Sequence, residues 1–501
     1  MKYFSTRDVK KSTPVSAAQA IKQGIAADGG LFMPESFPAM GADDISALCG
    51  LDYNSRAAVI LSKFLDDYSY DELLAFAGAA YASDKFIGGA APVYSLGETH
   101  RVLELWHGPT CAFKDMALQI MPRLLSAALK KTGENRTAYI LVATSGDTGK
   151  AALEGYKNVD GVKITVFYPE DGVSAMQKLQ MTSQDGNNVN VCAIKGNFDD
   201  AQTGVKMIFS DKDFAQELDN QGYFLSSANS INWGRLAPQI VYYFSAYCDL
   251  VNSGDIKLGE EIDIVVPTGN FGNIFAAYIA KRMGLYVGKL ICASNSNNIL
   301  TDFLTTGVYD RNRSFYTTMS PSMDILISSN LERLLYVIAG PERCTAYMKA
   351  LSENGKYAVE ADVLDEIKAN FAADYCSEEN TAKTIKNVFD NYNYLIDPHT
   401  ACAVYAAQSA EKSNAASGRN VKILTASTAS PYKFAADVLR SLGKQPQNPG
   451  FEVIYELSEL TKTAVPAPLD ALRSAKVRFS GSVGRTKEEL LCAAKDFVSA
   501  K

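Results

Sequence analysis

Lys114 has the local surroundings of a reactive amine. It stands in the stretch Trp-His-Gly-Pro-Thr-Cys-Ala-Phe-Lys-Asp at residues 106–115, where a strand expected over 102–105 is broken by a Gly-Pro turn. Apolar residues four apart then predict a helix over 113–130. The positive end of a helix dipole disfavours a protonated amine, which would leave Lys114 nucleophilic and able to form a Schiff base with an aldehyde. The alternative is an ordinary solvated lysine in a first helical turn.

A loop rich in hydroxyls and glycines is the second candidate. It follows a predicted strand over residues 138–143 and opens a predicted helix over 150–156. Converging amides and hydroxyls suit a carboxylate or a phosphate, but Asp147 would repel a phosphate, so a carboxylate is the better expected ligand. The other loop residues that could donate to it are Thr144, Ser145, Gly146 and Thr148. A helix cap with turn glycines is the alternative.

The third candidate is a second loop, which joins a predicted strand over residues 262–266 to a predicted helix over 274–283. It includes Gly269, Asn270, Phe271, Gly272 and Asn273. Two glycines and two asparagines at a helix start form a cup of amide donors for an anion. The lysine of the nucleotide P-loop does not follow, so a single phosphate is expected. A purely structural turn is the alternative.

Two more polar stretches could contact a ligand. Thr428 lies in the hydroxyl-rich loop 425–431, after a predicted strand over 421–424, and could meet a ring nitrogen. Asn232 and Arg235 are about one helical turn apart and could grip one anion together with Ser230. Helix caps and a surface arginine would explain the same residues without a ligand.

The elements that would position these residues alternate along the chain. Between about residues 100 and 300, aliphatic runs alternate with helical segments, which predicts a parallel sheet covered on both faces. Ligands of such sheets collect at the carboxyl ends of the strands, where all three loops lie. Residues 1–95 are expected to form helices that cover a neighbouring domain, and residues 300–410 a helical insertion. Further predicted strands cover residues 163–167, 189–194 and 290–293.

Composition excludes several classes of protein. The 501 residues predict two or three domains, and a net charge of −7 argues against a nucleic-acid or membrane-surface partner, since either would need a basic face. Nine scattered cysteines and three histidines show no metal-ligand spacing, so no metal site is expected. The cysteines are interpreted as reduced thiols of a cytoplasmic protein. No apolar run reaches the roughly 18 residues of a membrane-spanning helix.

A lysine, a phosphate cup, a hydroxyl for a ring nitrogen and a carboxylate loop together describe a pyridoxal phosphate site. On these and further motifs the chain resembles the threonine synthase family of the longer, fungal and enterobacterial type, within the tryptophan-synthase-like group of pyridoxal phosphate enzymes. The matching stretches, in family order, are residues 3–7, 28–31, 107–110, 113–115, 144–149, 196–199, 230–233, 269–273, 328–330, 332–333 and 397–400.

The resemblance implies an α/β fold with two open, twisted, mostly parallel sheet domains and the cofactor cleft between them. It implies an N-terminal module over residues 1–95, a large cofactor-binding domain over 96–116 and 236–501, and a small mobile domain over 117–235. The implied reaction converts O-phospho-L-homoserine and water into L-threonine and phosphate by γ-elimination and β-replacement. A monomer is expected, with a dimer as the alternative.

The resemblance also implies roles for individual residues. Lys114 would hold pyridoxal 5'-phosphate and then act as the mobile base, while residues 269–273 would cup its phosphate. Residues 145–148 would hold the substrate carboxylate and the phenolic edge of the cofactor, with Asp147 assigned to the cofactor. Thr428 would meet the pyridine nitrogen; a neutral hydroxyl there makes the ring a milder electron sink, which suits elimination and replacement over transamination. The candidates for the substrate phosphate are Asn197, Ser230, Asn232 and Arg235.

One departure and three alternatives accompany this interpretation. Ser430 stands where family members often carry histidine. A phospholyase of the same fold would release 2-oxobutyrate instead of adding water. A dehydratase or sulfhydrylase would leave the N-terminal module unexplained, and a non-catalytic binding protein would not need Lys114.

Overall fold

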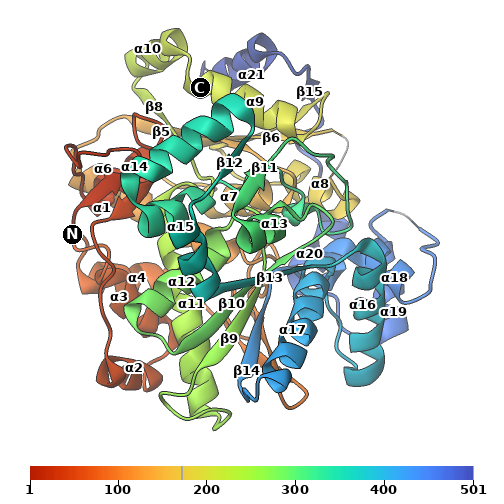
Figure 1. The fold of residues 1–501 in the computed structure, drawn as a ribbon. Coiled ribbons are helices and arrows are strands. Elements are labelled where there is room, and N and C mark those ends of the chain that lie inside the picture. The colour runs from red at the N-terminus through yellow and green to blue at the C-terminus, as the bar shows by residue number, and fades with distance from the viewer. Residues whose placement is uncertain (171–172, 449, 500–501) are drawn as a thin grey trace.

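Two sheets of mostly parallel strands, each flanked by helices, organise the computed structural model (Figure 1). The structure describes residues 1–170, 173–448 and 450–499. The predicted α/β class with two mostly parallel sheets is confirmed.

The larger sheet has six strands in the order β13-β10-β9-β14-β4-β3. In that order they span Phe371–Tyr375, Val287–Ser294, Ile262–Pro267, Lys422–Ser427, His100–Glu104 and Val93–Leu96. All neighbours are parallel except β3 and β4. The helices that cover this sheet include α11 (Trp233–Asn252), α12 (Gly272–Met283) and α17 (Pro398–Ala416). Strand side chains alternate between faces, so Val265 packs in the cluster of α17 while Ile264 and Val266 join that of α11 and α12.

The smaller sheet has five parallel strands in the order β15-β7-β6-β5-β8. In that order they span Ser482–Val483, Val189–Ile194, Val162–Pro169, Thr137–Ala143 and Tyr223–Ser226. The helices around it are α6 (Met121–Lys131), α7 (Asp147–Tyr156), α8 (Ala175–Thr182), α9 (Phe198–Phe209), α10 (Lys212–Asn220) and α21 (Lys487–Ser499). On β5, Tyr139 and Leu141 pack toward α9, α10 and α21, and Ile140 and Val142 pack on the opposite face.

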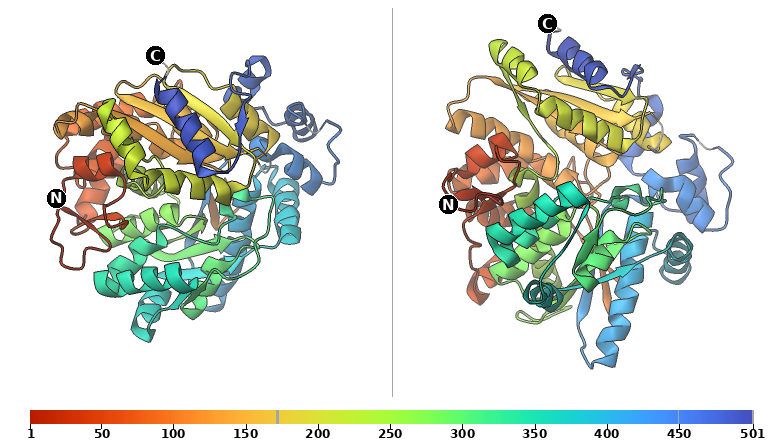
Figure 2. Two further views of the ribbon diagram at one scale, coloured as in Figure 1. Left: turned by 90° about the horizontal axis from the view of Figure 1, so that it is seen from above. Right: turned by 45° about the horizontal axis from the view of Figure 1, so that its top comes forward.

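The C-terminal segment returns to the smaller sheet. Strand β15 pairs with β7, and α21 lies beside α9 on the outer face of the sheet (Figure 2). Leu490, Ala494 and Val498 form the buried stripe of α21, since residues four apart share a helix face. This differs from the predicted large domain over 236–501: residues 482–499 complete the small domain instead, because their apolar stripe covers its sheet.

The N-terminal module shares its core with its neighbours. Its elements are β1 (Tyr3–Ser5), α1 (Ala17–Gln23), β2 (Phe32–Pro34), α2 (Ala42–Cys49), α3 (Tyr53–Ser62) and α4 (Tyr70–Ala80). Helices α2 and α3 pack on α11, and α1 packs on α6. The Arg56 guanidinium lies 2.6 Å from an Asp249 carboxylate oxygen and joins α3 to α11. The module therefore bridges the two sheet domains.

The segment over residues 300–410 is not only helical, which corrects the expectation of a helical insertion. It contains α13 (Ile299–Thr306), β11 (Val308–Asp310), α14 (Leu331–Asn354), β12 (Lys356–Ala358), α15 (Ala361–Asn370), β13 and α16 (Glu378–Tyr392). Strand β13 pairs in parallel with β10, with Leu290 opposite Phe371. Pairing with a strand some 80 residues earlier, rather than any local pattern, makes this segment the edge of the larger sheet. The chain then continues through α18 (Ala435–Ser441), α19 (Val453–Thr461) and α20 (Ala467–Asp470).

Candidate active site

A cavity of about 700 Å³ lies between the two sheets. Loops that follow the carboxyl ends of β5, β9 and β14 line it, as expected for parallel strands. Residues 25–27 and Gly29 of the N-terminal module also line it, as do Gln202 and Val205 of α9. Gly29 belongs to the matching stretch 28–31, but neither contribution was assigned a role in the site from the sequence. We call this space the catalytic cavity.

Lys114 enters the catalytic cavity at the start of a short helix. The backbone N–H of Phe113 donates to the Thr428 carbonyl at 2.8 Å, and Ala112 bridges Ala429, so this turn is bound to the loop after β14. Cys111 takes a left-handed φ of 56° in the same turn. Lys114 itself is the N-cap of α5 (Asp115–Leu118) and is 9% exposed. Its predicted position at a helix start is confirmed.

The helix predicted over residues 113–130 is broken into α5 and α6. Pro122 stands at the start of α6 and has no N–H to donate to the Leu118 carbonyl. That carbonyl instead faces Gly155 of α7, where an added Cβ would lie 2.0 Å from the oxygen. The proline thus ends α5 one turn after Lys114 and lets α7 approach closely.

The Lys114 amine meets one carboxylate and one hydroxyl. Its Nζ lies 3.6 Å from Asp147 Oδ2 and 3.5 Å from Ser322 Oγ. Burial lowers the pKa of Lys114 below its ordinary value, and the negative charge of Asp147 opposes that shift. Desolvation is therefore the main reason for a reactive amine, whereas the sequence argument invoked the helix dipole.

Asp147 is buried and held by a second lysine. Its Oδ1 lies 2.7 Å from Lys433 Nζ and accepts a hydrogen bond from Gln177 Nε2 at 2.9 Å. Burial by itself would raise the pKa of Asp147, but Lys433 and Lys114 together hold it below the ordinary value. Lys433 also donates to the Thr110 carbonyl at 2.9 Å. The carboxylate is thus ionised between two amines.

Two of the remaining residues of the 144–148 loop shape the turn, and the other two have hydroxyls that are available to a ligand. The Thr144 hydroxyl accepts the N–H groups of Gly146 and Gly149, both at 2.9 Å, and shapes the turn. Gly146 adopts a φ of 139° and packs against Gln177, where no Cβ would fit. Ser145 and Thr148 line the catalytic cavity, and within the described chain their hydroxyls have no hydrogen-bond partner. These two hydroxyls are the ones free for a ligand.

The loop 269–273 lines the cavity opposite and begins α12. Phe271 is its N-cap, with a left-handed φ of 61°. The Asn273 amide oxygen accepts hydrogen bonds from Tyr242 at 2.9 Å and from Tyr243, while its Nδ2 is buried with no partner in the part of the chain that the structure describes. A buried donor without a partner is unfavourable. A phosphate at the first turn of α12 fits this cup.

Thr428 and Ser430 differ in accessibility. Thr428 lines the catalytic cavity. Ser430 is fully buried outside it, where its backbone N–H donates to the Cys111 carbonyl at 3.0 Å. The neighbouring Ser427 hydroxyl accepts from Trp106 Nε1 at 3.0 Å. Thr428, predicted to meet a ring nitrogen, thus lines the cavity. Ser430, which differs from the family pattern, supports the loop from outside the cavity.

The four candidates for the substrate phosphate are not all in the cavity. Ser230 and Arg235 line it. Asn232 does not: its amide nitrogen donates to the carbonyls of Ile21 and Ser227, and its oxygen caps α11. Asn197 is exposed and caps α9 through the Asp200 N–H at 2.9 Å. Both asparagines satisfy local backbone groups, which corrects their proposed grouping with Arg235.

Arg235 is 3% exposed, and burial lowers its pKa to about 10. One guanidinium nitrogen donates to the Ala228 carbonyl at 2.6 Å, and its Nε has no partner within the described ranges. No carboxylate within ion-pair distance neutralises it in the described chain. A buried arginine with donors to spare is suited to an anionic group.

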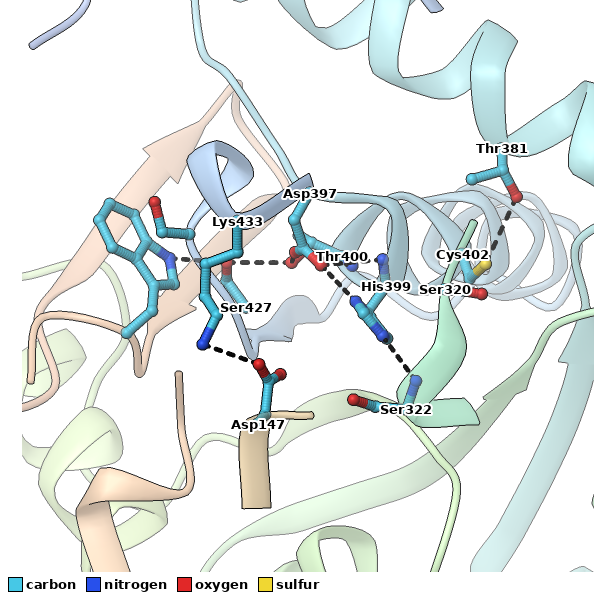
Figure 3. A network of polar contacts seen from close by, with 12 residues as sticks. Asp147, Ser320, Ser322, Thr381, Asp397, His399, Thr400, Cys402, Ser427 and Lys433 are labelled. Atoms are coloured by element: carbon cyan, nitrogen blue, oxygen red, sulfur yellow. Dashed lines mark hydrogen bonds and ion pairs between the residues drawn. The ribbon is translucent and has the colours of Figure 1, made fainter. Parts of the chain in front are cut away.

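Sequence reasoning missed a hydrogen-bonded chain that runs from Asp397 through His399 to Ser322 (Figure 3). Asp397 Oδ2 lies 2.6 Å from His399 Nδ1, and the Ser322 N–H donates to His399 Nε2 at 3.1 Å. Since Nε2 accepts, Nδ1 carries the proton that Asp397 accepts. The dyad fixes the backbone of Ser322, whose hydroxyl reaches Lys114. His399 had been matched only as part of the 397–400 motif, and Lys433 had been given no role.

Two kinds of feature are absent from the part of the chain that the structure describes. It contains no group of three or more histidine, cysteine, aspartate or glutamate side chains that could hold a metal ion. None of its helices has both the length and the apolar composition needed to cross a membrane.

Three family models match the chain. The model described as "Threonine synthase N terminus" matches residues 2–81, "Pyridoxal-phosphate dependent enzyme" matches 101–426, and "Threonine synthase, C-terminal" matches 400–480. The middle match includes most strands of both sheets and the loops 144–148 and 269–273 of the catalytic cavity, and it ends just before the loop that follows β14.

Known proteins similar to this chain agree with those models. The threonine synthase of Pseudomonas aeruginosa is 39% identical over 459 residues, which cover 90% of this chain and 92% of that protein. Threonine synthase-like 1 of Homo sapiens is 38% identical over 458 residues, 88% of this chain but 60% of that protein, so the chain spans about three-fifths of the length of that relative. The crystal structure of pyridoxal-phosphate-bound threonine synthase from Brucella melitensis matches with a TM-score of 0.87 and 36% identity, covering 100% of both chains.

Proposed function

The chain belongs to the threonine synthase family of pyridoxal-phosphate-dependent enzymes, and from this premise we propose that it converts O-phospho-L-homoserine and water into L-threonine and phosphate. The observation that carries the proposal is the Lys114 amine, with its lowered pKa, facing an amide cup across a cavity that also contains the unneutralised Arg235. The geometry provides a nucleophilic amine and two separate places for phosphate groups.

The residues present fit pyridoxal 5'-phosphate. The buried, unpartnered Nδ2 of Asn273 and the backbone amides at the start of α12 would hold its phosphate. Lys114 would bind its aldehyde, and the Thr428 hydroxyl would face its ring nitrogen. When bound, the cofactor supplies a ring that withdraws electrons from the carbon next to the substrate amine.

Proton transfer is the work of Lys114. A desolvated amine is neutral at a lower pH than an exposed lysine, so it can accept a proton from a substrate carbon. Asp147, 3.6 Å away, stabilises the ammonium ion that results, and Lys433 keeps Asp147 ionised while this happens. Ser322 orients the amine through its hydroxyl.

Substrate recognition would use the two walls of the cavity separately. The Ser145 and Thr148 hydroxyls and the first amides of α7 would bind the substrate carboxylate at a helix N-terminus. Arg235 and Ser230 would bind its phosphate on the other side. Holding the substrate at both ends places its reacting carbons between them, near Lys114.

The assay of the purified, cofactor-loaded protein should give a visible absorbance band of lysine-bound cofactor and release phosphate and threonine in equal amounts from O-phospho-L-homoserine. Lys114→Ala should lose both the band and turnover while remaining folded, because the side chain makes no helix-capping hydrogen bond. Lys349→Ala, at an exposed lysine of α14, is the matched control and should keep both.

Other outcomes would reject the proposal in distinct ways. Equal release of phosphate and 2-oxobutyrate would identify a phospholyase. A protein without the absorbance band would be a binding protein of this fold. Turnover by Lys114→Ala at the wild-type rate would remove Lys114 from the reaction.

We also propose the cytoplasm as the compartment and a monomer as the assembly. None of the nine cysteines, all within the described residues, forms a disulfide, which supports a reducing environment. Light scattering on the protein as it elutes from a gel-filtration column would measure its mass in solution. A mass twice that of the 54.3 kDa chain would contradict the monomer.

A further inference from the structure

A second cavity, of about 740 Å³, lies among α4, α6 and α7. It shares no lining residue with the catalytic cavity. Its volume is within the range of small-molecule sites, roughly 300–1,000 Å³. We call it the basic cavity, because the charged side chains around it are mostly lysine and arginine.

The charges around the basic cavity are unbalanced. Five cations line it, namely Lys85, Arg123, Lys130, Lys131 and Lys157, against the two carboxylates Glu72 and Glu154. Lys131 lies 2.9 Å from Glu72 and Lys157 lies 2.7 Å from Glu154. The excess of three positive charges contrasts with the chain as a whole, whose net charge is −7. Such a local excess attracts anions.

Three of the cations have no carboxylate partner. Lys85, Arg123 and Lys130 form no ion pair with any side chain of the described residues. Lys85 donates to the Ala79 carbonyl at 3.0 Å and Arg123 donates to the Gln119 carbonyl at 2.9 Å, so two of them are positioned by backbone groups. Burial lowers the pKa of both Lys85 and Arg123, and a bound anion would relieve that unfavourable burial.

A buried amide provides a second, independent sign of a ligand. Gln119 lines the basic cavity, is only 4% exposed, and its Nε2 has no hydrogen-bond partner in the chain as described. Buried amide donors in proteins are normally paired, and an unpaired one is costly. Nε2 is a donor only, so any partner that it gains must be an acceptor, and Gln119 lies in the same wall as Arg123, which donates to its carbonyl.

Part of the remaining wall is apolar, although Ser126 and Asn158 also line it. Phe76, Pro109, Pro122 and Val159 lie beside the cations. A ligand that fills the cavity therefore needs both a multiply charged anionic group and an uncharged flat or apolar part. We propose that the basic cavity binds a phosphorylated small molecule of the nucleoside di- or triphosphate class, with its phosphates on Lys85, Arg123 and Lys130.

The two cavities lie at opposite ends of one helix. Helix α7 begins with Asp147 in the catalytic cavity, and Glu154 and Gly155 in its last turn line the basic cavity. Pro109 of the basic cavity precedes Thr110, whose carbonyl accepts from Lys433, the partner of Asp147. A nucleotide in the basic cavity would contact the last turn of α7 and Pro109, the two segments that connect this cavity to Asp147.

The test is calorimetric titration of the cofactor-loaded enzyme with ATP and, separately, with sodium tripolyphosphate. One molecule of ATP should bind per chain, more weakly as salt is added, because the contacts are ionic. Tripolyphosphate should bind more weakly than ATP, since it cannot use the apolar wall. The double variant Lys85→Gln/Arg123→Gln should lower ATP affinity by about tenfold or more.

A control and a second variant keep the test decisive. Lys349→Gln/Lys383→Gln removes the same charge from exposed helix positions and should leave ATP affinity unchanged. Gln119→Glu puts a carboxylate into the wall and should also weaken binding by about tenfold or more. The proposal is overturned if ATP does not bind, if both double variants bind alike, or if binding is lost instead with Arg235→Gln, which would place the nucleotide in the catalytic cavity.

Discussion

The loops 144–149 and 269–273 face the same cavity and have the same local design, yet they differ in charge. Each follows a parallel strand and begins a helix. The first contains Asp147, ionised between two lysines, and the second contains no charged side chain. The carboxylate that would stabilise the Lys114 ammonium ion lies on one side of the cavity. The donors that would bind the cofactor phosphate lie on the other side.

This difference follows from what each side has to hold. An amine that gains and loses a proton benefits from a nearby fixed carboxylate. A cofactor phosphate is already negative, so a carboxylate beside it would repel it, whereas amides at a helix N-terminus attract it without a counter-ion. Removing the charge of the first loop should therefore affect turnover and stability, whereas filling the space in the second loop should affect cofactor affinity.

The largest effect is expected from Asp147→Asn on the charged side. Lys433, which is 1% exposed, would lose its partner, and breaking a buried ion pair costs about 3–5 kcal/mol of stability. Turnover should fall by about 100-fold or more, because Lys114 loses the carboxylate that stabilises its protonated form. The midpoint of thermal unfolding and the rate of phosphate release measure the two losses.

The matched control removes a carboxylate from an exposed pair. Glu379→Gln breaks the Lys383 contact on the surface of α16 and should leave the midpoint of thermal unfolding nearly unchanged, because the pair is exposed to solvent. If Asp147→Asn were as stable and as active as this control, the charged loop would have no role in proton transfer.

Arg235→Ala should have the next largest effect, and on a different measurement. Arg235 provides the positive charge that the neutral loop 269–273 lacks, and its loss from the substrate phosphate should raise KM for O-phospho-L-homoserine by an amount worth about 2–4 kcal/mol. Cofactor absorbance should be unchanged, since the amide cup remains. An unchanged KM would remove Arg235 from the substrate site, and loss of the absorbance band would assign it to the cofactor instead.

Gly269→Ala tests the space on the neutral side. The new Cβ would lie 2.4 Å from the Ser322 carbonyl oxygen, so the cup and residue 322 would have to separate. Cofactor affinity, followed by titration of the absorbance band, should fall by about tenfold. Gly78→Ala, in α4 with nothing within 4 Å of its Cβ, is the control and should not change it. Equal affinities in the two variants would show that the cup tolerates the extra methyl group.

The neutral side was the more predictable from sequence. The residues of the cup are consecutive, and their types alone indicate an anion site at a helix start. The same is true of the strands β5, β7 and β9, whose aliphatic runs matched the observed elements closely. Local composition was sufficient wherever the strand, loop and helix are contiguous.

The charged side depends on contacts between distant residues. Lys433 is nearly 290 residues from Asp147, and His399 acts on Ser322 across 77 residues. Asn232 shows the opposite problem, since its type and spacing suited an anion site while its amide is consumed by the carbonyls of Ile21 and Ser227. Pairing partners, including that of β13 at the sheet edge, are set by the fold and have no local signature.

Asp115 provides the smallest and most specific test, because it is a buried carboxylate next to Lys114 without an ion pair in the described chain. Burial raises its pKa to about 6 from an ordinary value of 3.8, although hydrogen bonds from Thr110 oppose the shift. A raised folded-state pKa gives stability that is complete below pH 3.8 and is lost as the pH rises through about 6. Going from pH 7 to pH 5 should therefore stabilise the wild type by about 1 kcal/mol more than Asp115→Asn, measured as the difference between their unfolding midpoints at the two pH values. Parallel pH profiles, or a wild type that gains less than the variant, would show that Asp115 is stabilised as an anion like Asp147, and the contrast between a carboxylate with lysine partners and one without would fail.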